Sequence, residues 1–344
     1  MIDCVGVRGL LPYTRRVIYL ADGEIAVLRR EGVQVEAFDG TPRVRAPEQV
    51  RWDAVQVEKG GFRHFMQKEI WEQPRAIRDT LLGRIAWETG RVCLRELGPV
   101  ADRLSDIDRV HLIACGTSLH AALMGKWMIE TLARLPVEVD YGSEYRYRNP
   151  LVDSRTLSVL ISQSGETADT LAAGRETREK GAVTLAISNV PGSTLTRECH
   201  ATLATQAGPE IGVAATKTFS AQIVVLLLLA VELAQRRGTL AEKERRRLLE
   251  ALACLPARLE QLLERNEAVE ALARRFYRAR DFLFLGRGIH FPVALEGALK
   301  LKEISYIHAE GSPAGEMKHG LNALIDDQLP VVFLATHEAG CADS

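Results

Sequence analysis

The sequence predicts an α/β protein whose main sheet is parallel and covered by helices on both faces. Two observations support this fold class. Apolar, β-branched runs alternate regularly with helix-forming stretches between residues 110 and 235, as expected when parallel strands are joined by helical crossovers. The aliphatic run at 157–161 is typical of a strand buried on both faces. Ligands of such sheets bind at the carboxyl ends of the strands, so the loops at that edge are the candidate site.

The first 58 residues contain hairpin signals. Strand-like segments at 17–20, 25–28 and 33–38 alternate with turns at Asp22–Gly23 and Asp39–Gly40. Three short strands do not make a self-sufficient β domain. We therefore expect that a segment that packs on them is missing.

The α/β alternation follows a stretch from Phe62 to Leu104 that we predict to be helical, with Pro74 at the start of a second helix. The predicted strands lie at 110–114, 137–141, 157–161, 183–187 and 201–205. The predicted helices lie at 119–132, 167–180, near Leu195 and at 216–235. Together these elements make one complete parallel-sheet domain.

A charged helical segment at 240–280 leads into a partial repeat of this unit. The repeat has a strand at 282–285, the turn Gly286–Gly288, a helix at 292–307 and a strand at 329–334. The turn lacks the third glycine of a dinucleotide fingerprint, and no acidic residue ends a second strand, so we reject a dinucleotide site. A doubly wound domain needs about four or five strands. We therefore expect the second domain to be cut short.

The turn after the strand at 157–161 has the features of an anion site. Ser162, Ser164 and Thr167 offer three hydroxyl groups within six residues, and Gly165 permits close backbone approach. The helix that begins there presents unpaired amides and a partial positive charge, so a phosphate needs no lysine or arginine. The alternative is that one hydroxyl is simply an N-cap. Because no G-x-x-x-x-G-K-S/T motif is present, a phosphomonoester fits better than a nucleoside triphosphate.

Acidic and basic side chains gather on the helix at 292–307. Glu296, Lys300 and Glu303 are four and three residues apart and therefore share one helix face. The alternative is a solvated salt-bridge face. A carboxylate at a ligand is the usual base for moving a proton between the two carbons of a ketose–aldose pair, which favours a catalytic role.

The glycine-rich stretch at 308–320 follows this helix. We expect it to be a flexible loop that closes over a ligand, with His308 and His319 beside it. Histidine titrates in the range where opening of a sugar ring requires a proton donor or acceptor.

Composition excludes several classes of partner. A formal net charge of −1 over 344 residues argues against nucleic acid and anionic membrane as main partners. Six cysteines without a C-x-x-C pair indicate neither a disulfide framework nor a zinc site, and they point to the reducing cytoplasm. No signal-peptide pattern is present. The longest apolar run, 223–231, is shorter than the ~20 residues that span a bilayer, so we expect a buried helix of the kind found in subunit interfaces.

Five long motifs extend these observations. They are RHFMQKEIWEQP at 63–74, CGTS at 115–118, SQSGETADT at 162–170, EIGVA at 210–214 and ALEGALKLKEISYIHAE at 294–310. In these motifs the chain resembles the glutamine:fructose-6-phosphate amidotransferases, or glucosamine-6-phosphate synthases, from about residue 10 to 335.

The resemblance implies sugar isomerase (SIS) domains with a flavodoxin-like, three-layer αβα fold. It implies a glutaminase-domain remnant at 1–58, a helical linker at 59–104, a first SIS domain at 105–240, a helical connector at 241–280 and a truncated second SIS domain at 281–344. The implied activity is synthesis of glucosamine 6-phosphate from fructose 6-phosphate and glutamine, in cytoplasmic hexosamine biosynthesis, without a cofactor or metal.

The resemblance also implies roles for particular residues. Hydroxyl and backbone groups would bind the substrate: Ser118, Ser162, Gln163, Ser164 and Thr167 at the phosphate, and Thr117 and Val213 at the sugar. Glu303 would be the base that moves a proton between C1 and C2, with Lys300 beside it. His319 would open the sugar ring, reaching in from the other subunit of a homodimer.

Three features depart from the family pattern. Met1–Cys4 does not match the Cys-Gly-Ile start of the glutaminase, the similarity ends after Thr336 before a family active-site lysine, and Ala215 replaces a common serine. We therefore expect a fragment without glutaminase activity. Two alternatives stay open: a non-catalytic sugar-phosphate-binding SIS module, and an SIS deglycase or isomerase that does not use glutamine.

Overall fold

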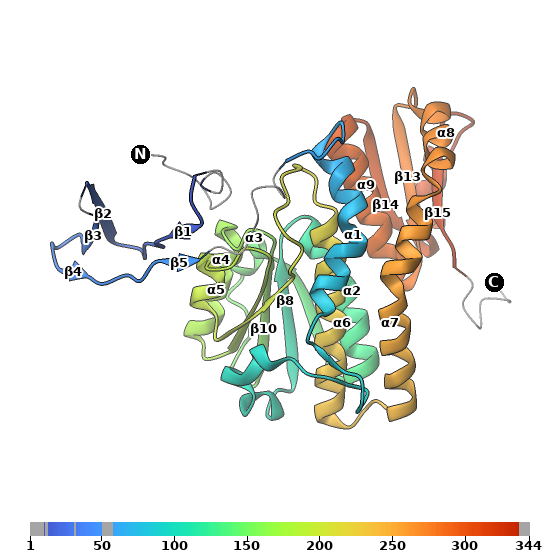
Figure 1. The fold of residues 1–344 in the computed structure, drawn as a ribbon. Helices are drawn as coiled ribbons and strands as arrows, with labels where there is room; N and C mark the ends of the chain where they lie inside the picture. Colours follow the sequence, from blue (N-terminus) through green and yellow to red (C-terminus); the bar gives the residue numbers. More distant parts are fainter. Residues whose placement is uncertain (1–9, 11–12, 31, 50–57, 337–344) are drawn as a thin grey trace. The chain divides into compact units, whose positions relative to one another are not determined.

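The computed structural model describes residues 10, 13–30, 32–49 and 58–336. The expected departures at Met1–Cys4 and after Thr336 lie outside these residues. The chain divides into two compact units, residues 1–63 and 64–344, and each is described by itself (Figure 1).

The N-terminal unit contains short antiparallel strands. β2 (Glu24–Arg29) pairs with β3 (Gly32–Ala37), and β3 pairs with β4 (Pro42–Arg43). β1 (Arg16–Val17) pairs with β5 (Glu48–Gln49). The strands predicted at 25–28 and 33–38 are thus confirmed, whereas the segment predicted at 17–20 contributes a single residue to β1.

The larger unit is built on a five-stranded parallel sheet. Its strands are β8 (Arg109–Ala114), β9 (Val137–Tyr141), β10 (Thr156–Ser162), β11 (Val183–Ser188) and β12 (Ala201–Ala204). Their spatial order is β12-β11-β10-β8-β9, and all neighbours are parallel. This is the flavodoxin-like order, in which the direction of winding reverses between the first and third strands, here β8 and β10. The predicted fold class is confirmed.

Helices cover both faces of this sheet. α2 (Thr117–Ala133) and α6 (Lys217–Arg237) pack on one face, with α1 (Phe65–Leu81) outside them. The short helix α3 (Gly142–Tyr145), α4 (Ala168–Glu179) and α5 (Thr194–Glu198) pack on the other. Figure 1 shows these two layers on either side of β8 and β10.

The strands supply apolar side chains to both layers because successive residues point to opposite faces. Leu112 and Val159 are register partners and belong to the core under α2 and α6. Ile113 and Leu160 are the next pair and belong to the core that contains Tyr145 of α3. All four side chains are fully buried, as predicted for strands covered on both faces.

α6 is the one helix in the described part of the chain that is long and apolar enough to cross a membrane. However, 72% of its apolar window is buried inside the protein. Its apolar character is therefore accounted for by the core, as expected for the run at 223–231.

The prediction that residues 62–104 are helical is correct for α1 and for two short 3-10 helices, Arg95–Val100 and Arg103–Ser105, but not for the segment between α1 and the first of them. After α1 come the hairpin β6 (Ile85–Ala86) and β7 (Arg91–Val92) and a 3-10 helix at Arg95–Val100. Pro74 lies inside α1 rather than at the start of a new helix. A proline deprives the carbonyl four residues earlier of its helical donor, and here the Gln73 side-chain amide donates to the Ile70 carbonyl at 3.1 Å. A local side chain thus takes over the lost hydrogen bond.

The C-terminal part forms a second, three-stranded parallel sheet. β13 (Asp281–Gly286) lies between β14 (His308–Pro313) and β15 (Val331–Leu334). α7 (Glu242–Leu263) and α8 (Asn266–Phe276) precede this sheet, and α9 (Phe291–Ser305) connects β13 to β14.

The prediction that 308–320 is a flexible loop is wrong for its first half. Residues 308–313 form β14, in which Ala309 is buried against the sheet, and 314–319 form a 3-10 helix. A Cβ at Gly311 would lie 2.6 Å from the Leu295 Cα of α9. This glycine is therefore required for close packing of strand and helix, not for flexibility.

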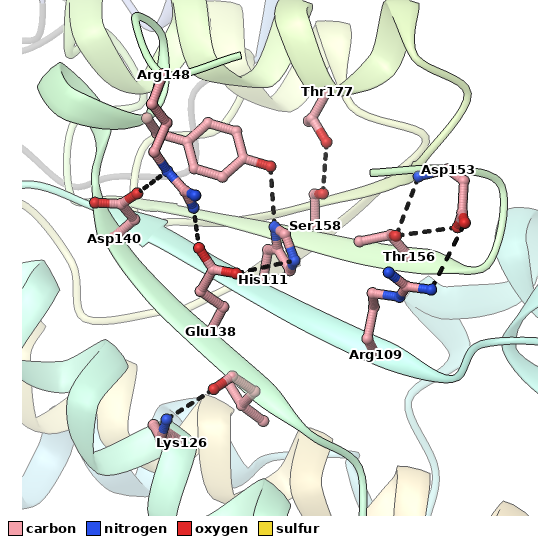
Figure 2. A network of polar contacts seen from close by, with 12 residues as sticks. Arg109, His111, Lys126, Glu138, Asp140, Arg148, Asp153, Thr156, Ser158 and Thr177 are labelled. Atoms are coloured by element: carbon pink, nitrogen blue, oxygen red, sulfur yellow. Dashed lines mark hydrogen bonds and ion pairs between the residues drawn. The ribbon is translucent and has the colours of Figure 1, made fainter. Parts of the chain in front are cut away.

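Polar side chains on the first strands of the main sheet form a separate network, shown in Figure 2. His111 on β8 pairs through Nδ1 with the Tyr145 hydroxyl at 3.0 Å, and its Nε2 lies 3.7 Å from the Glu138 carboxylate. Arg148 pairs with Glu138 and, at 2.5 Å, with Asp140. Because every member has a partner, the network is a satisfied polar cluster.

Candidate functional site

The two loops that carry the predicted hydroxyl groups meet where the winding of the sheet reverses. β8 ends at Ala114, which is the register partner of Ile161 near the end of β10. The segments that follow these strands therefore leave the sheet side by side. This is the position at which open α/β sheets bind their ligands.

The loop after β10 is held in one conformation by its own side chains. The hydroxyl oxygens of Ser162 and Thr167 lie 2.9 Å apart, and the Gly165 amide donates to Ser162 Oγ at 3.0 Å. The Glu166 amide donates to Ser164 Oγ at 3.2 Å. Thr167 is the N-cap residue of α4, but its side chain makes no cap hydrogen bond. The simple capping alternative therefore does not explain this hydroxyl.

Gly165 is required by the shape of this loop. Its φ of +68° is in the left-handed region, and a Cβ would lie 2.0 Å from Ser193 Oγ. The carboxylate of Glu166 accepts the Thr194 amide at 2.8 Å. The loop is thus packed tightly against the start of α5.

The residues that follow β8 form hydrogen bonds with α9. Thr117, the first residue of α2, donates its hydroxyl to the Glu296 carboxylate at 3.0 Å and accepts from Lys300 Nζ at 3.1 Å. Its neighbour Ser118 accepts from Gln222 Nε2 of α6 at 3.0 Å. Thr117 is therefore in direct contact with the acid–base face predicted on α9.

That face is not a solvated salt-bridge face. Lys300 Nζ lies 3.4 Å from Glu296 and 2.5 Å from Glu303, and the side chains of Glu296, Lys300 and Glu303 are 7%, 16% and 32% exposed. The first two are largely withdrawn from water, while the Glu303 carboxylate stays accessible. A positive charge beside an accessible carboxylate is a suitable arrangement for a proton-transferring base.

Val213 lies in the connection between β12 and α6. Its side chain is 98% exposed, and among the described residues its amide has no hydrogen-bond partner. The loop around it is nevertheless fixed: the buried Glu210 accepts the amides of Thr216 and Thr218 at 2.8 and 3.3 Å. The Val213 backbone is therefore available to a ligand.

His319 stands apart from the other predicted residues. It ends the 3-10 helix Ala314–His319, is exposed, and makes no hydrogen bond or ion pair with any residue that the structure describes. The chain by itself thus brings together Thr117, Lys300 and Glu303, and separately Ser162 and Thr167, but leaves His319 outside both groups.

Among the polar residues around these loops, Gln163 was predicted for its backbone, whereas His120, Thr216 and Gln222 were not predicted. His120 Nδ1 lies 2.7 Å from the second Glu296 oxygen. Three buried side-chain atoms lack a hydrogen-bond partner within the described part of the chain: Gln163 Nε2, Thr216 Oγ1 and Gln222 Oε1. All three belong to segments at the carboxyl ends of the strands or to helices that begin there. The sequence signal available for Gln222 was a glutamine inside an otherwise apolar helix.

The strand order and these loops define an SIS domain. The SIS domain family matches residues 103–232 and 275–339, more than half of the chain, and the chain belongs to that family. Glucosamine-6-phosphate deaminase from Thermotoga maritima, 22% identical, shares this fold with a TM-score of 0.63 over 81% of this chain and 79% of that one.

More similar relatives place the chain within the family. Glutamine–fructose-6-phosphate aminotransferase (isomerizing) from Thermus thermophilus is 55% identical over 96% of this chain and 54% of the relative. The enzyme of the same name from Methanosarcina acetivorans is 48% identical over 96% and 53%. The C-terminal domain of glucosamine-fructose-6-phosphate aminotransferase from Francisella tularensis has a TM-score of 0.79 at 39% identity, over 82% of this chain and 79% of that domain.

The chain is thus a member of the glutamine–fructose-6-phosphate aminotransferase (isomerizing) family, which confirms the resemblance inferred from the motifs. It spans about half the length of the curated relatives that it matches.

Proposed function

We propose that this chain binds fructose 6-phosphate at the reversal point of the main sheet and transfers a proton between its C1 and C2. The observation that supports this most directly is the position of Thr117. Its hydroxyl contacts both Glu296 and Lys300, so the phosphate-side loops and the acid–base face of α9 form one site. In the longer proteins of this family, the same site would serve the conversion of fructose 6-phosphate and glutamine to glucosamine 6-phosphate.

The phosphate is bound by the loop after β10. Ser162, Ser164 and Thr167 supply hydroxyl groups, Gln163 supplies its backbone, and the N-terminus of α4 adds a partial positive charge. Ser118 reaches the same ligand from the start of α2.

The sugar is held between Thr117 and the Val213 backbone, and its carbons face Glu303. The Glu303 carboxylate removes a proton from C1 of the open-chain ketose and returns it to C2, while the hydroxyl proton on O1 passes to O2, which gives the aldose. Lys300, 2.5 Å from this carboxylate, stabilises the negative charge that develops on the substrate oxygens. This transfer moves protons only, so it needs no electron acceptor.

Ring opening is assigned to His319 of a second copy of the chain, in a cytoplasmic homodimer. The exposure of His319 and its lack of contacts with the described residues support a role outside its own subunit. The N-terminal unit is proposed to be the end of a glutaminase domain.

The binding step can be tested by the thermal shift of the purified chain. A ligand that binds only the folded state stabilises it by about 2.7 kcal/mol at a hundredfold excess over Kd. We expect fructose 6-phosphate to raise the melting temperature, fructose to leave it unchanged, and Ser162→Ala with Thr167→Ala to abolish the effect.

Thr89→Ala is the matched control, because it removes an exposed hydroxyl in the β6–β7 hairpin whose one hydrogen bond to a described residue is to the Ala86 carbonyl at 3.3 Å. If fructose shifts the melting temperature as much as fructose 6-phosphate does, or if the double variant keeps the shift, the assignment of the phosphate site is contradicted.

A further inference from the structure

We propose that Glu69 of α1 is a positioning residue for the sugar-binding loop at residues 210–216. The inference rests on the proposed function, because it concerns the loop that presents the Val213 backbone. It adds a residue that makes no contact with the substrate and lies more than 140 positions from this loop in the sequence.

The Glu69 carboxylate holds two consecutive amides of the loop. It is 2% exposed, and Oε1 accepts the Ile211 amide at 2.5 Å and the Gly212 amide at 3.0 Å. Burial raises the pKa of the Glu69 carboxyl, and the hydrogen bonds from the Gly212 and Ile211 amides act in the opposite direction because they favour the carboxylate. These two hydrogen bonds from adjacent residues fix the orientation of the peptide that leads directly into Val213.

The loop sequence is adapted to this carboxylate. A Cβ at Gly212 would lie 2.5 Å from Glu69 Oε2 and 3.4 Å from the Met66 backbone. Only a glycine at this position lets the loop backbone approach α1 closely enough for both amides to reach Glu69.

The helix that carries Glu69 is itself held in place. Glu72 pairs with the buried Lys217 at 2.6 Å, and Gln73 accepts from the Ser220 hydroxyl at 2.5 Å. Residues 69, 72 and 73 lie on one face of α1, three and four positions apart, and this face is docked on the first turn of α6. Glu69 therefore presents its carboxylate from a fixed support.

Within the described residues, no other group accepts a hydrogen bond from the amides of Ile211 to Val213. Glu210 fixes the far end of the loop through the amides of Thr216 and Thr218, while Val213 is exposed and its amide is unpaired. Loss of the Glu69 carboxylate should therefore release Ile211 to Val213 and leave the phosphate loop after β10 unchanged.

The proposal can be tested because it predicts a loss of sugar binding without a loss of phosphate binding. Dissociation constants for fructose 6-phosphate and for inorganic phosphate are measured by calorimetry on the whole chain for wild type, Glu69→Ala and Glu69→Gln. We expect Glu69→Ala to bind fructose 6-phosphate about tenfold more weakly and inorganic phosphate within about twofold of wild type. Glu69→Gln keeps one acceptor oxygen, so its dissociation constant for fructose 6-phosphate should lie between those of wild type and Glu69→Ala. This variant also provides the test if the alanine variant does not fold.

Asp79→Asn is the control, since it makes the same chemical change at an exposed carboxylate of α1 and should leave both constants unchanged. Unchanged affinity for fructose 6-phosphate in both Glu69 variants would overturn the proposal. An equal loss for both ligands would also overturn it, because Glu69 would then support the fold in general. If the wild-type chain binds fructose 6-phosphate no more tightly than inorganic phosphate, the proposed function itself is refuted.

Discussion

His111 should make the stability of the larger unit sensitive to mild acid. Burial, together with the positive charges of Arg148 and Arg109, lowers the pKa of His111 from 6.5 to about 4. The Glu138 carboxylate 3.7 Å away does not offset this effect, because it is already paired with Arg148 (Figure 2). The folded protein therefore keeps this imidazole neutral at pH values where the unfolded chain protonates it.

The sign and size of the effect follow from linkage. The stabilisation is fully present above about pH 6.5 and is lost as the pH falls toward 4, since only the unfolded state binds the proton in that interval. A difference of about 2.5 pKa units corresponds to about 3 kcal/mol in total. About 2 kcal/mol of this should be lost between about pH 7 and pH 4.5.

The assay compares wild type with His111→Gln, which cannot be protonated but still offers Tyr145 a polar partner. The free energy of unfolding is measured with urea at about pH 7 and pH 4.5, and other titrating groups cancel in the comparison. Wild type should lose about 2 kcal/mol more than the variant. Arg148→Gln should reduce the loss, because it removes a positive charge and frees Glu138 to pair with the protonated ring. Parallel losses in wild type and His111→Gln would refute the reasoning.

Three further changes test the site and its support. Gly165→Ala should abolish the phosphate-dependent thermal shift. Gly181→Ala is the control, because this glycine also has a positive φ, +90°, but no atom lies within 4 Å of the added Cβ. The control should lose only the ~1–2 kcal/mol of stability that a left-handed conformation costs, and it should keep the shift. Glu303→Gln should bind fructose 6-phosphate normally but exchange the C1 proton with solvent at least about a hundredfold more slowly than wild type. The exchange is followed by NMR in heavy water. If the wild-type chain shows no exchange, the non-catalytic binding module is favoured. Lys217→Met should cost about 2 kcal/mol in urea unfolding, because the partly buried Glu72 carboxylate loses its partner at 2.6 Å and keeps the more distant Lys68 at 3.6 Å and Arg75 at 3.8 Å. A much smaller cost would show that these cations or water replace the ammonium group.

The parts of the fold that depend on local pattern could be predicted. The alternation of apolar strands and helices identified all five strands of the main sheet, because β8, β10 and β11 are buried almost throughout and helical segments separate the strands. The errors occurred where a side-chain hydrogen bond or a packing contact overrides the signal of a single proline or glycine. Pro74 suggested a helix start, and the glycines after His308 suggested a mobile loop, but packing of Gly311 against α9 makes that stretch a strand.

The same distinction applies to the site. Ser162 and Thr167 are five residues apart, and Lys300 and Glu303 are three apart, so spacing alone places each pair together. Glu69 was missed because its function depends on amides that only the packing of α1 on α6 brings within reach. A carboxylate in an amphipathic helix gives no sign in the sequence of which backbone it will meet.

The contact between Thr117 and Lys300 joins residues 183 positions apart and has a consequence for how the site can be divided. The phosphate loop is built entirely from the first sheet, whereas the proposed base lies on a helix of the second. Changes in α9 should therefore affect proton transfer without affecting phosphate recognition, and changes after β10 should do the reverse. Thr117 is the exception, because it hydrogen-bonds α9 while lying at the start of α2 beside the phosphate loop. Thr117→Val retains the volume of the side chain and removes the hydroxyl. It should weaken the binding of fructose 6-phosphate and also slow the exchange of the C1 proton. An effect on only one of these two properties would show that the two halves of the site act independently.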